Sequence, residues 1–165
     1  MLAPGPDHFD PSGDPLRFRQ ALGRYATGVV VVTTSTASGP VGLTVNSFAS
    51  VSLSPPLVLW SPAKSSGRHN AFRDARQFAV HVLAGGQKKV CDHFVRSSGG
   101  FGDFCAAFNE AGIPLIPGCA AIFECTQVAV HDGGDHSIII GEVNRVHSGE
   151  ASALVFRGGE FEVSR

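Results

Sequence analysis

The segment from residue 42 to residue 60, GLTVNSFASVSLSPPLVLW, constrains the fold of this chain more than any other stretch. Apolar side chains occupy most odd positions from Leu43 to Leu53. The even positions between them carry Thr44, Asn46, Phe48, Ser50 and Ser52. Such alternation with a period of two is typical of β-strands, whose successive side chains point to opposite faces. The segment therefore predicts a strand, a polar corner, a second strand and, after Pro55-Pro56, a third short apolar strand.

The even-numbered face of this segment carries no charge, since no Lys, Arg, Asp or Glu occurs between residues 42 and 60. A strand face that meets solvent usually carries such residues. We expect this face to lie against something flat and uncharged with polar edges, a description that a flavin ring fits. The alternative is a strand whose small hydroxyl groups pair with neighbouring backbone.

The composition limits the classes of partner. A chain of 165 residues is long enough for one domain with its own core, and its low charged share of 16% favours an oligomer that hides part of its exterior. The formal net charge is −1 and there is no basic block, which argues against nucleic acid and anionic membrane surfaces as partners. No apolar run is long enough to span a bilayer.

The N-terminal stretch MLAPGPDHFDPSGDP lacks the basic and apolar regions of a signal peptide. We expect a flexible tail over residues 1–14, one domain over residues 15–165, and a cytoplasmic location. The chain has four cysteines, which form no CxxC pair and no zinc-like pairing with histidine: Cys91, Cys105, Cys119 and Cys125. They predict reduced, mostly buried thiols, with neither a disulfide framework nor a metal site.

The rest of the chain is rich in strand signals. Asp14 and Pro15 are typical of a helix start, and an apolar stripe at helical spacing should pack on a core: Phe18, Ala21, Leu22 and Tyr25. Strands are predicted at 29–34, 42–53, 57–60, 78–83, 120–130, 136–146 and 154–163, helices at 68–74 and 87–94, and a long loop with some helix at 96–117. Six or more strands without a βαβ rhythm predict a barrel rather than a doubly wound sheet.

Three short motifs have a functional and an ordinary interpretation each. Lys64-Ser65-Ser66-Gly67 precedes a predicted helix and suits a phosphate, or it is a helix cap beside a solvated lysine. In Gly133-Gly134-Asp135-His136 the histidine can reach a ligand at a barrel mouth, or the motif is a polar turn. Phe156-Arg157-Gly158-Gly159 places an aromatic ring and a cation at a turn, or it is a hairpin with a surface arginine. The GGFGDFC stretch at 99–105 lacks the third glycine and the strand–helix context of a dinucleotide-binding loop.

The order of these features resembles the short-chain flavin reductases that serve two-component flavin monooxygenases, within the split-barrel FMN-binding superfamily. The matching segments are 18–34, 42–60, 64–66, 77–87, 134–143 and 154–161. The resemblance implies a mainly β fold, a six-stranded antiparallel split barrel with flanking helices, usually as a homodimer. The segment 96–118 matches poorly, and Glu160 stands where a basic or polar residue is more usual.

The resemblance also implies an activity, in which hydride passes from NADH or NADPH to FMN or FAD and the reduced flavin goes to a partner monooxygenase. His136 would be the catalytic residue, at the nicotinamide. Nine residues would bind the flavin: Thr44, Asn46 and Ser47 near the ring and ribityl chain, Ser50, Val51 and Ser52 next along the chain, Lys64 and Ser66 at the phosphate, and Phe156 beside the ring. The open alternatives are a flavin carrier or sensor without turnover, an oxidase of the pyridoxamine-phosphate type, and a barrel used for assembly.

Overall fold

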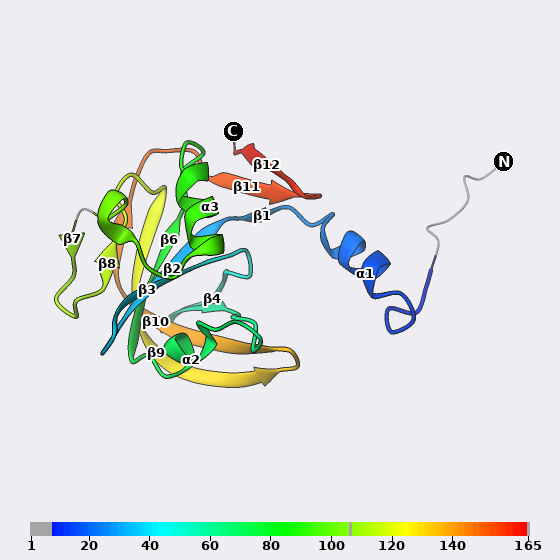
Figure 1. The fold of residues 1–165 in the computed structure, drawn as a ribbon, viewed down its shortest axis with the longest axis horizontal. Coiled ribbons are helices and arrows are strands. Elements are labelled where there is room, and N and C mark those ends of the chain that lie inside the picture. The colour runs from blue at the N-terminus through cyan, green and yellow to red at the C-terminus, as the bar shows by residue number, and fades with distance from the viewer. Residues whose placement is uncertain (1–7, 106, 165) are drawn as a thin grey trace.

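A computed structural model describes residues 8–105 and 107–164, and it confirms the mainly β class (Figure 1). Seven antiparallel strands form the main sheet: β2 (Val30–Thr36), β3 (Gly39–Val45), β4 (Ala49–Leu53), β5 (Pro56–Trp60), β6 (Gln77–Val82), β9 (Ala121–Gly133) and β10 (His136–Ser148). Their order is β3-β2-β6-β9-β10-β5-β4, one strand more than the six predicted. The sheet curls without pairing its edge strands β3 and β4, as in a split barrel.

Smaller elements flank the main sheet. A three-stranded sheet has the order β1-β11-β12, with β1 (Thr27–Gly28), β11 (Leu154–Arg157) and β12 (Glu160–Val163). The helices are α1 (Pro15–Leu22), α2 (His69–Arg73), α3 (Lys88–Arg96) and the 3-10 turn η1 (Phe101–Asp103). The segment predicted as a long loop also contains a short hairpin, β7 (Ala107–Phe108) and β8 (Pro114–Leu115). None of the helices within the described ranges is long and apolar enough to cross a membrane.

The valine run of β2 is explained by two cores, one on each face of the sheet. Val30 and Val32 point into the barrel, where they join a cluster around Trp60. Val29 and Val31 point outward to a second cluster beneath α3. A strand that is covered on both faces has no solvent side, so every position of this run is apolar.

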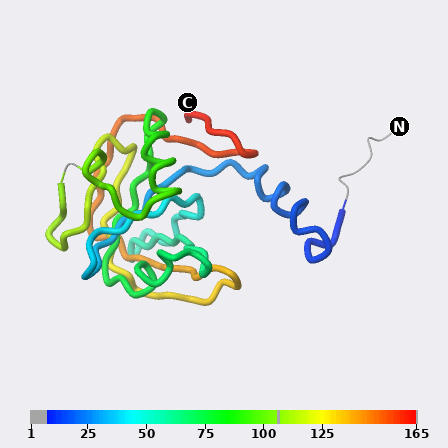
Figure 2. Tube along the Cα trace, viewed as in Figure 1, coloured from blue at the N-terminus to red at the C-terminus, as the bar shows by residue number. Residues whose placement is uncertain are grey.

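The first helix departs from the sequence-based prediction. Asp14 caps it, since the Oδ1 atom accepts a hydrogen bond of 3.0 Å from the backbone N–H of Arg17. However, α1 contains no buried residue, and it extends away from the barrel (Figures 1 and 2). The prediction that its apolar stripe packs on a core is therefore wrong for the isolated chain.

The predicted alternation from Leu43 to Leu53 is also interrupted. Leu43 and Val45 pack beside the barrel core as expected, but Phe48, assigned to the polar face, does so too and stacks on Phe123 at a centroid distance of 5.6 Å. The chain leaves the sheet between β3 and β4, and a bulge shifts the β4–β5 register between Ser50 and Ser52. These irregularities reset which side chains face inward.

The four cysteines are free thiols in the structure, as expected from their spacing. Cys91, Cys119 and Cys125 are buried. Burial raises the pKa of Cys119 and Cys125 to about 12, so these thiols stay protonated and act as small apolar groups.

Candidate functional site

Two hollows lie side by side at the end of β3, and together we call them the β3 groove. The first has a volume of about 260 Å³ and brings together five predicted site residues: Thr44, Asn46, Ser47, Ser66 and His136. The second, of about 170 Å³, is lined by Thr44 and Asn46 again, with the predicted residue Phe156 and its neighbour Phe161. Residues from distant parts of the chain thus meet at one place on the surface, around Thr44 to Asn46.

The break between β3 and β4 gives the groove its polar rim. The chain leaves the sheet after Val45 and rejoins it at Ala49, so the backbone groups of residues 46–48 lie outside the strand ladders. Such N–H and C=O groups need partners, and a ligand with a polar edge can provide them. Asn46 is exposed at this corner, where its amide can donate and accept hydrogen bonds.

The hydroxyl groups of Thr44 and Ser47 fix the walls of the groove. Thr44 Oγ1 donates to the carbonyl of Cys91 at 2.9 Å, which ties β3 to α3. Ser47 Oγ donates to the carbonyl of Ser61 at 3.1 Å and accepts from the N–H of Ser61 at 2.9 Å. For these two residues the ordinary interpretation, pairing with neighbouring backbone, is the one that the structure shows.

His136 begins β10 and is fixed from two sides. Its backbone bridges to Ala63, and the next residue, Ser137, donates its N–H to the carbonyl of Pro62 at 3.1 Å. The Nδ1 atom of His136 lies 2.7 Å from the carboxylate of Asp135. Because a carboxylate only accepts, Nδ1 carries the proton, and this hydrogen bond lowers the pKa of Asp135. The half-exposed imidazole is thereby oriented at the edge of the first hollow.

The two residues predicted at a phosphate behave differently from each other. Ser66 lines the first hollow, and its Oγ accepts from the N–H of Arg68 at 3.2 Å. Lys64 is not among the lining residues, because its ammonium group donates to the carbonyl of Gly134 at 2.6 Å and pairs with Asp132. This pairing lowers the pKa of Asp132. Lys64 therefore joins two loops beside the groove.

The predicted residues Ser50, Val51 and Ser52 lie in β4 and line neither hollow. They follow Asn46 closely in sequence, but the corner and the bulge direct this edge strand away from the groove.

Phe156 does line the second hollow, where it packs against Phe161 with ring centroids 5.1 Å apart. The β11–β12 register pairs these two rings, so a hairpin around Gly158-Gly159 is the sequence signal that could have identified Phe161.

Arg68 is a residue of the site region that sequence reasoning missed. Its guanidinium donates to the carbonyls of Phe94 at 2.5 Å and Val95 at 3.0 Å, near the C-terminal end of α3. A cation is favourable at this end of a helix because the last carbonyls lack partners. Burial lowers the pKa of Arg68. No local signal marks this role, since the partners are 26 and 27 residues away in the chain.

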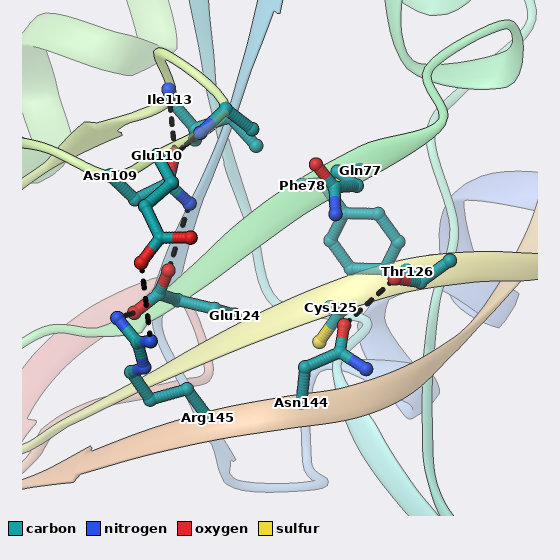
Figure 3. A pocket seen from close by; sticks show the side chains of 11 residues that line it. Gln77, Phe78, Asn109, Glu110, Ile113, Glu124, Cys125, Thr126, Asn144 and Arg145 are labelled. Atoms are coloured by element: carbon teal, nitrogen blue, oxygen red, sulfur yellow. Dashed lines mark hydrogen bonds and ion pairs between the residues drawn. The ribbon is translucent and has the colours of Figure 1, made fainter.

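A larger cavity, of about 520 Å³, lies elsewhere, between β6, β9, β10 and the loop around Asn109 (Figure 3). We call it the Glu124 cavity, after a carboxylate whose residue is only 8% exposed. Glu124 accepts hydrogen bonds from His147 at 2.6 Å and from Asn109 at 2.8 Å. Arg145 lies 4.0 Å from Glu124 and 3.7 Å from Glu110. The charged groups of this cavity are thus paired with one another.

The pKa of Glu124 shows how complete this pairing is. Burial acts to raise the pKa, because it penalises the charged carboxylate. The hydrogen bonds from His147 and Asn109 and the charge of Arg145 outweigh burial and lower the pKa overall. None of the predicted site residues lines this cavity.

Comparison with known proteins gives consistent matches over nearly the whole chain. Residues 22–164 match the model of the family described as "Flavin reductase like domain". The "FMN reductase (NADH) SmoA" of Agrobacterium fabrum is 54% identical over 154 residues, which cover 93% of this chain and 88% of that protein. The "Flavin-dependent monooxygenase, reductase subunit HsaB" of Mycobacterium tuberculosis is 38% identical over 152 residues, covering 90% of this chain and 81% of that protein.

A solved structure extends the likeness to three dimensions. The Streptomyces globisporus NADH:FAD oxidoreductase SgcE6, in complex with NAD and FAD fragments, superposes with a TM-score of 0.88 at 39% identity. The match covers 95% of this chain and 96% of that one.

Proposed function

The chain belongs to the flavin reductase-like family, and we propose that it transfers hydride from NADH to FMN or FAD and supplies the reduced flavin to a separate monooxygenase. The family match and the relatives confirm the resemblance drawn from the sequence. The observation within this chain that carries the proposal is the β3 groove, where segments far apart in sequence meet around Thr44, Asn46 and His136.

The donor set of the groove fits a flavin. Among the described residues, no Lys, Arg, Asp or Glu lines either hollow. Val29, Val45 and Phe156 offer apolar surface for the faces of a planar ring. Asn46 and the backbone of residues 46–48 offer hydrogen bonds for its polar edge. A neutral ring with polar edges needs this combination and no counter-ion.

The proposed roles of the chain's residues follow from their positions. Bound flavin supplies the hydride acceptor, and the protein aligns and shields the reacting groups. We assign Asn46 to the polar edge of the ring, and Ser66 with its turn to the phosphate. Lys64 reaches that phosphate only by leaving Asp132. His136, fixed by Asp135, is assigned to orient the nicotinamide at the groove mouth. Such alignment contributes up to about 7–11 kcal/mol to lowering the barrier.

Ser50, Val51 and Ser52 remain proposed flavin contacts from the family resemblance, although they lie outside both hollows of a single chain. We further propose that the protein is a homodimer that works in the cytoplasm. Low surface charge and exposed apolar residues support the homodimer. Free, mostly buried thiols are typical of a reducing compartment. The proposed division into a tail at 1–14 and a domain at 15–165 is a prediction, and residues 1–7 lie outside the described part.

The direct test follows absorbance at 340 nm while the purified protein oxidises NADH, or NADPH in a parallel series, with added FMN, FAD or riboflavin. We expect turnover that requires flavin and is faster with NADH. Reactions without flavin and without protein are the controls. Flavin binding without turnover would replace this proposal by a carrier or sensor function, and absence of binding would limit the relationship to the fold.

A further inference from the structure

His69 contacts two walls of the β3 groove without lining either hollow. It is the first residue of α2, and it is only 7% exposed. The Nε2 atom of its imidazole lies 2.9 Å from the hydroxyl oxygen of Ser137, a residue that is 5% exposed. This buried polar contact joins α2 to the start of β10 across 68 residues of sequence.

The direction of this hydrogen bond follows from the other nitrogen atom of the ring. The Nδ1 atom of His69 lies 3.3 Å from the side-chain oxygen of Asn70. Because an amide oxygen only accepts, Nδ1 carries the proton, and Nε2 accepts the hydrogen bond from the hydroxyl of Ser137. Removal of either partner leaves a buried polar atom without a hydrogen bond, so the contact holds its two residues in place.

Ser137 anchors the strand end that presents His136 to the groove. Successive side chains of a strand point to opposite faces. Ser137 and Ile139 are buried, whereas His136 is half-exposed and lines the first hollow. The hydrogen bond from Ser137 to His69 therefore holds this strand end from its inner face. A displacement of Ser137 moves the imidazole of His136, because the two residues share one segment of backbone.

The backbone of His69 contacts the opposite wall of the first hollow. Its N–H donates to the carbonyl of Ser66 at 3.0 Å. The N–H of Ser66 donates to the carbonyl of Ala63 at 3.0 Å, and Ala63 bridges to His136. The turn proposed for the phosphate and the histidine proposed for the nicotinamide are thus joined twice, once through backbone and once through the side chains of His69 and Ser137.

We propose that His69 is a positioning residue that couples the phosphate turn to His136, so that a flavin with a phosphate group improves binding of the nicotinamide. This inference rests on the proposed function and adds to it a selection between flavins. A phosphate at Ser66 fixes the turn and the start of α2. His69 transmits this constraint to Ser137, which holds His136 where the nicotinamide docks. Riboflavin has no phosphate group, so it leaves the turn unconstrained.

His81 provides an internal comparison, because it is a second buried histidine with a hydrogen bond. Its Nδ1 atom lies 3.0 Å from the carbonyl of Val31 in β2. Neither His81 nor Val31 lines a hollow of the groove. Substitution of His81 should therefore change stability alone, whereas substitution of His69 should also change how the two ligands affect each other.

The experiment measures the Kd of NAD+ by titration calorimetry, with protein saturated by FMN or by riboflavin. NAD+ binds without hydride transfer, so the measurement does not depend on turnover. In wild-type protein NAD+ should bind about 10-fold more tightly beside FMN, within the range of coupling between two sites. His69→Leu and Ser137→Ala should each reduce this ratio to less than about 2-fold, and the double variant should reduce it no further.

Two variants control for stability, and urea denaturation checks that every protein is folded at the working temperature. His69→Gln should keep most of the ratio, because its side-chain oxygen can accept the hydrogen bond from Ser137. His81→Leu should keep all of it. A ratio that survives in both His69→Leu and Ser137→Ala would overturn the coupling and leave His69 a structural role.

The coupling and the proposed function fail in different ways. Wild-type protein that oxidises NADH with flavin, but binds NAD+ equally well beside FMN and riboflavin, would overturn the coupling alone. Protein that shows the ratio but oxidises no NADH with any flavin would overturn the reductase function and support the coupling. Protein that binds no NAD+ beside either flavin would overturn both.

Discussion

The β3 groove and the Glu124 cavity differ in how their polar groups are used. In the Glu124 cavity, the larger of the two, Glu124, Arg145 and His147 are paired within the protein. In the β3 groove, the rim consists of an exposed amide, a half-exposed imidazole and backbone outside the ladders. A ligand can add hydrogen bonds at the groove, but at the cavity it must first replace ion pairs. Volume alone would have selected the Glu124 cavity.

The difference has a physical basis in the cost of burying charge. A buried carboxylate such as Glu124 is tolerated only when its oxygens are bonded, and removing its partners is strongly destabilising. The network therefore serves to hold the loop around Asn109 on the sheet. A neutral group such as the exposed amide of Asn46 hydrogen-bonds to water when no ligand is bound, so its free-energy cost to the fold is small. The comparison predicts that substitutions in the groove change activity, whereas substitutions in the cavity change stability.

The largest effect is expected at the mouth of the groove. His136→Ala should lower kcat/KM for NADH by about 100-fold, because a misplaced nicotinamide loses alignment. Flavin affinity, measured by fluorescence titration, should change less than about 3-fold, which is the effect of losing at most one weak contact. Unchanged steady-state kinetics would remove His136 from the site.

The opposite pattern is expected in the Glu124 cavity. Glu124→Gln should lower the free energy of unfolding by about 1–3 kcal/mol, because the hydrogen bond from His147 and the attraction of Arg145 are weakened. Urea denaturation measures this loss. Flavin-dependent NADH oxidation should stay within about 2-fold of wild type at a temperature where both proteins are folded. A large loss of kcat with intact stability would contradict the division between the two regions.

The free energy of unfolding should also depend on pH through His81, which is buried in β6. Burial lowers the pKa of His81 from 6.5 to about 4. Below pH 6.5 the imidazole of His81 therefore binds a proton in the unfolded chain but not in the folded chain. The free energy of unfolding falls as pH decreases from 6.5 to 4. At pH 5 the loss is about 2 kcal/mol relative to pH 7.

His81→Leu should remove this part of the pH dependence. Urea denaturation of both proteins at pH 7 and pH 5 isolates the effect, because the other titrating groups are shared. Equal losses in the two proteins would show that His81 is not the group responsible.

A smaller effect, on flavin affinity, is expected when the side-chain amide of Asn46 is removed, and Asn144 provides the comparison. Asn46→Leu should weaken flavin binding by about 10-fold, equivalent to about 1.4 kcal/mol, since it removes hydrogen bonds at the rim. Asn144→Leu is the matched control, because Asn144 lines the Glu124 cavity and accepts a hydrogen bond from Thr126 at 2.8 Å. Fluorescence titration of both variants should show a change only for Asn46.

The smallest effect, on FMN affinity, is expected when the ammonium group of Lys64 beside the groove loses its partner Asp132. Asp132→Asn removes the carboxylate that pairs with Lys64. The freed ammonium group can then turn toward the flavin phosphate, and FMN affinity should rise about 2–3-fold at low salt, with little change for riboflavin. An equal change for both flavins would exclude a phosphate contact.

The strands and much of the groove could be predicted from the sequence, because these depend on local patterns. The valine run at β2, the Gly133-Gly134 turn before His136 and the hairpin at Gly158-Gly159 each follow from neighbouring residues. The role of Arg68 and the pairing of Lys64 with Asp132 could not be predicted. Their partners lie 26 and 68 residues away, and nothing nearby in the sequence specifies them.

By itself, the sequence determined the mainly β class, the family and the residue types of the groove, because periodicity and turn residues act over a few positions. Only the tertiary structure decided that Phe48 joins the barrel core, that Ser50, Val51 and Ser52 line neither hollow, and that α1 has no buried residue. A bulge, a corner and the distance of a helix from the barrel are set by packing between distant segments. The same alternating residues are compatible with either outcome until the chain has folded.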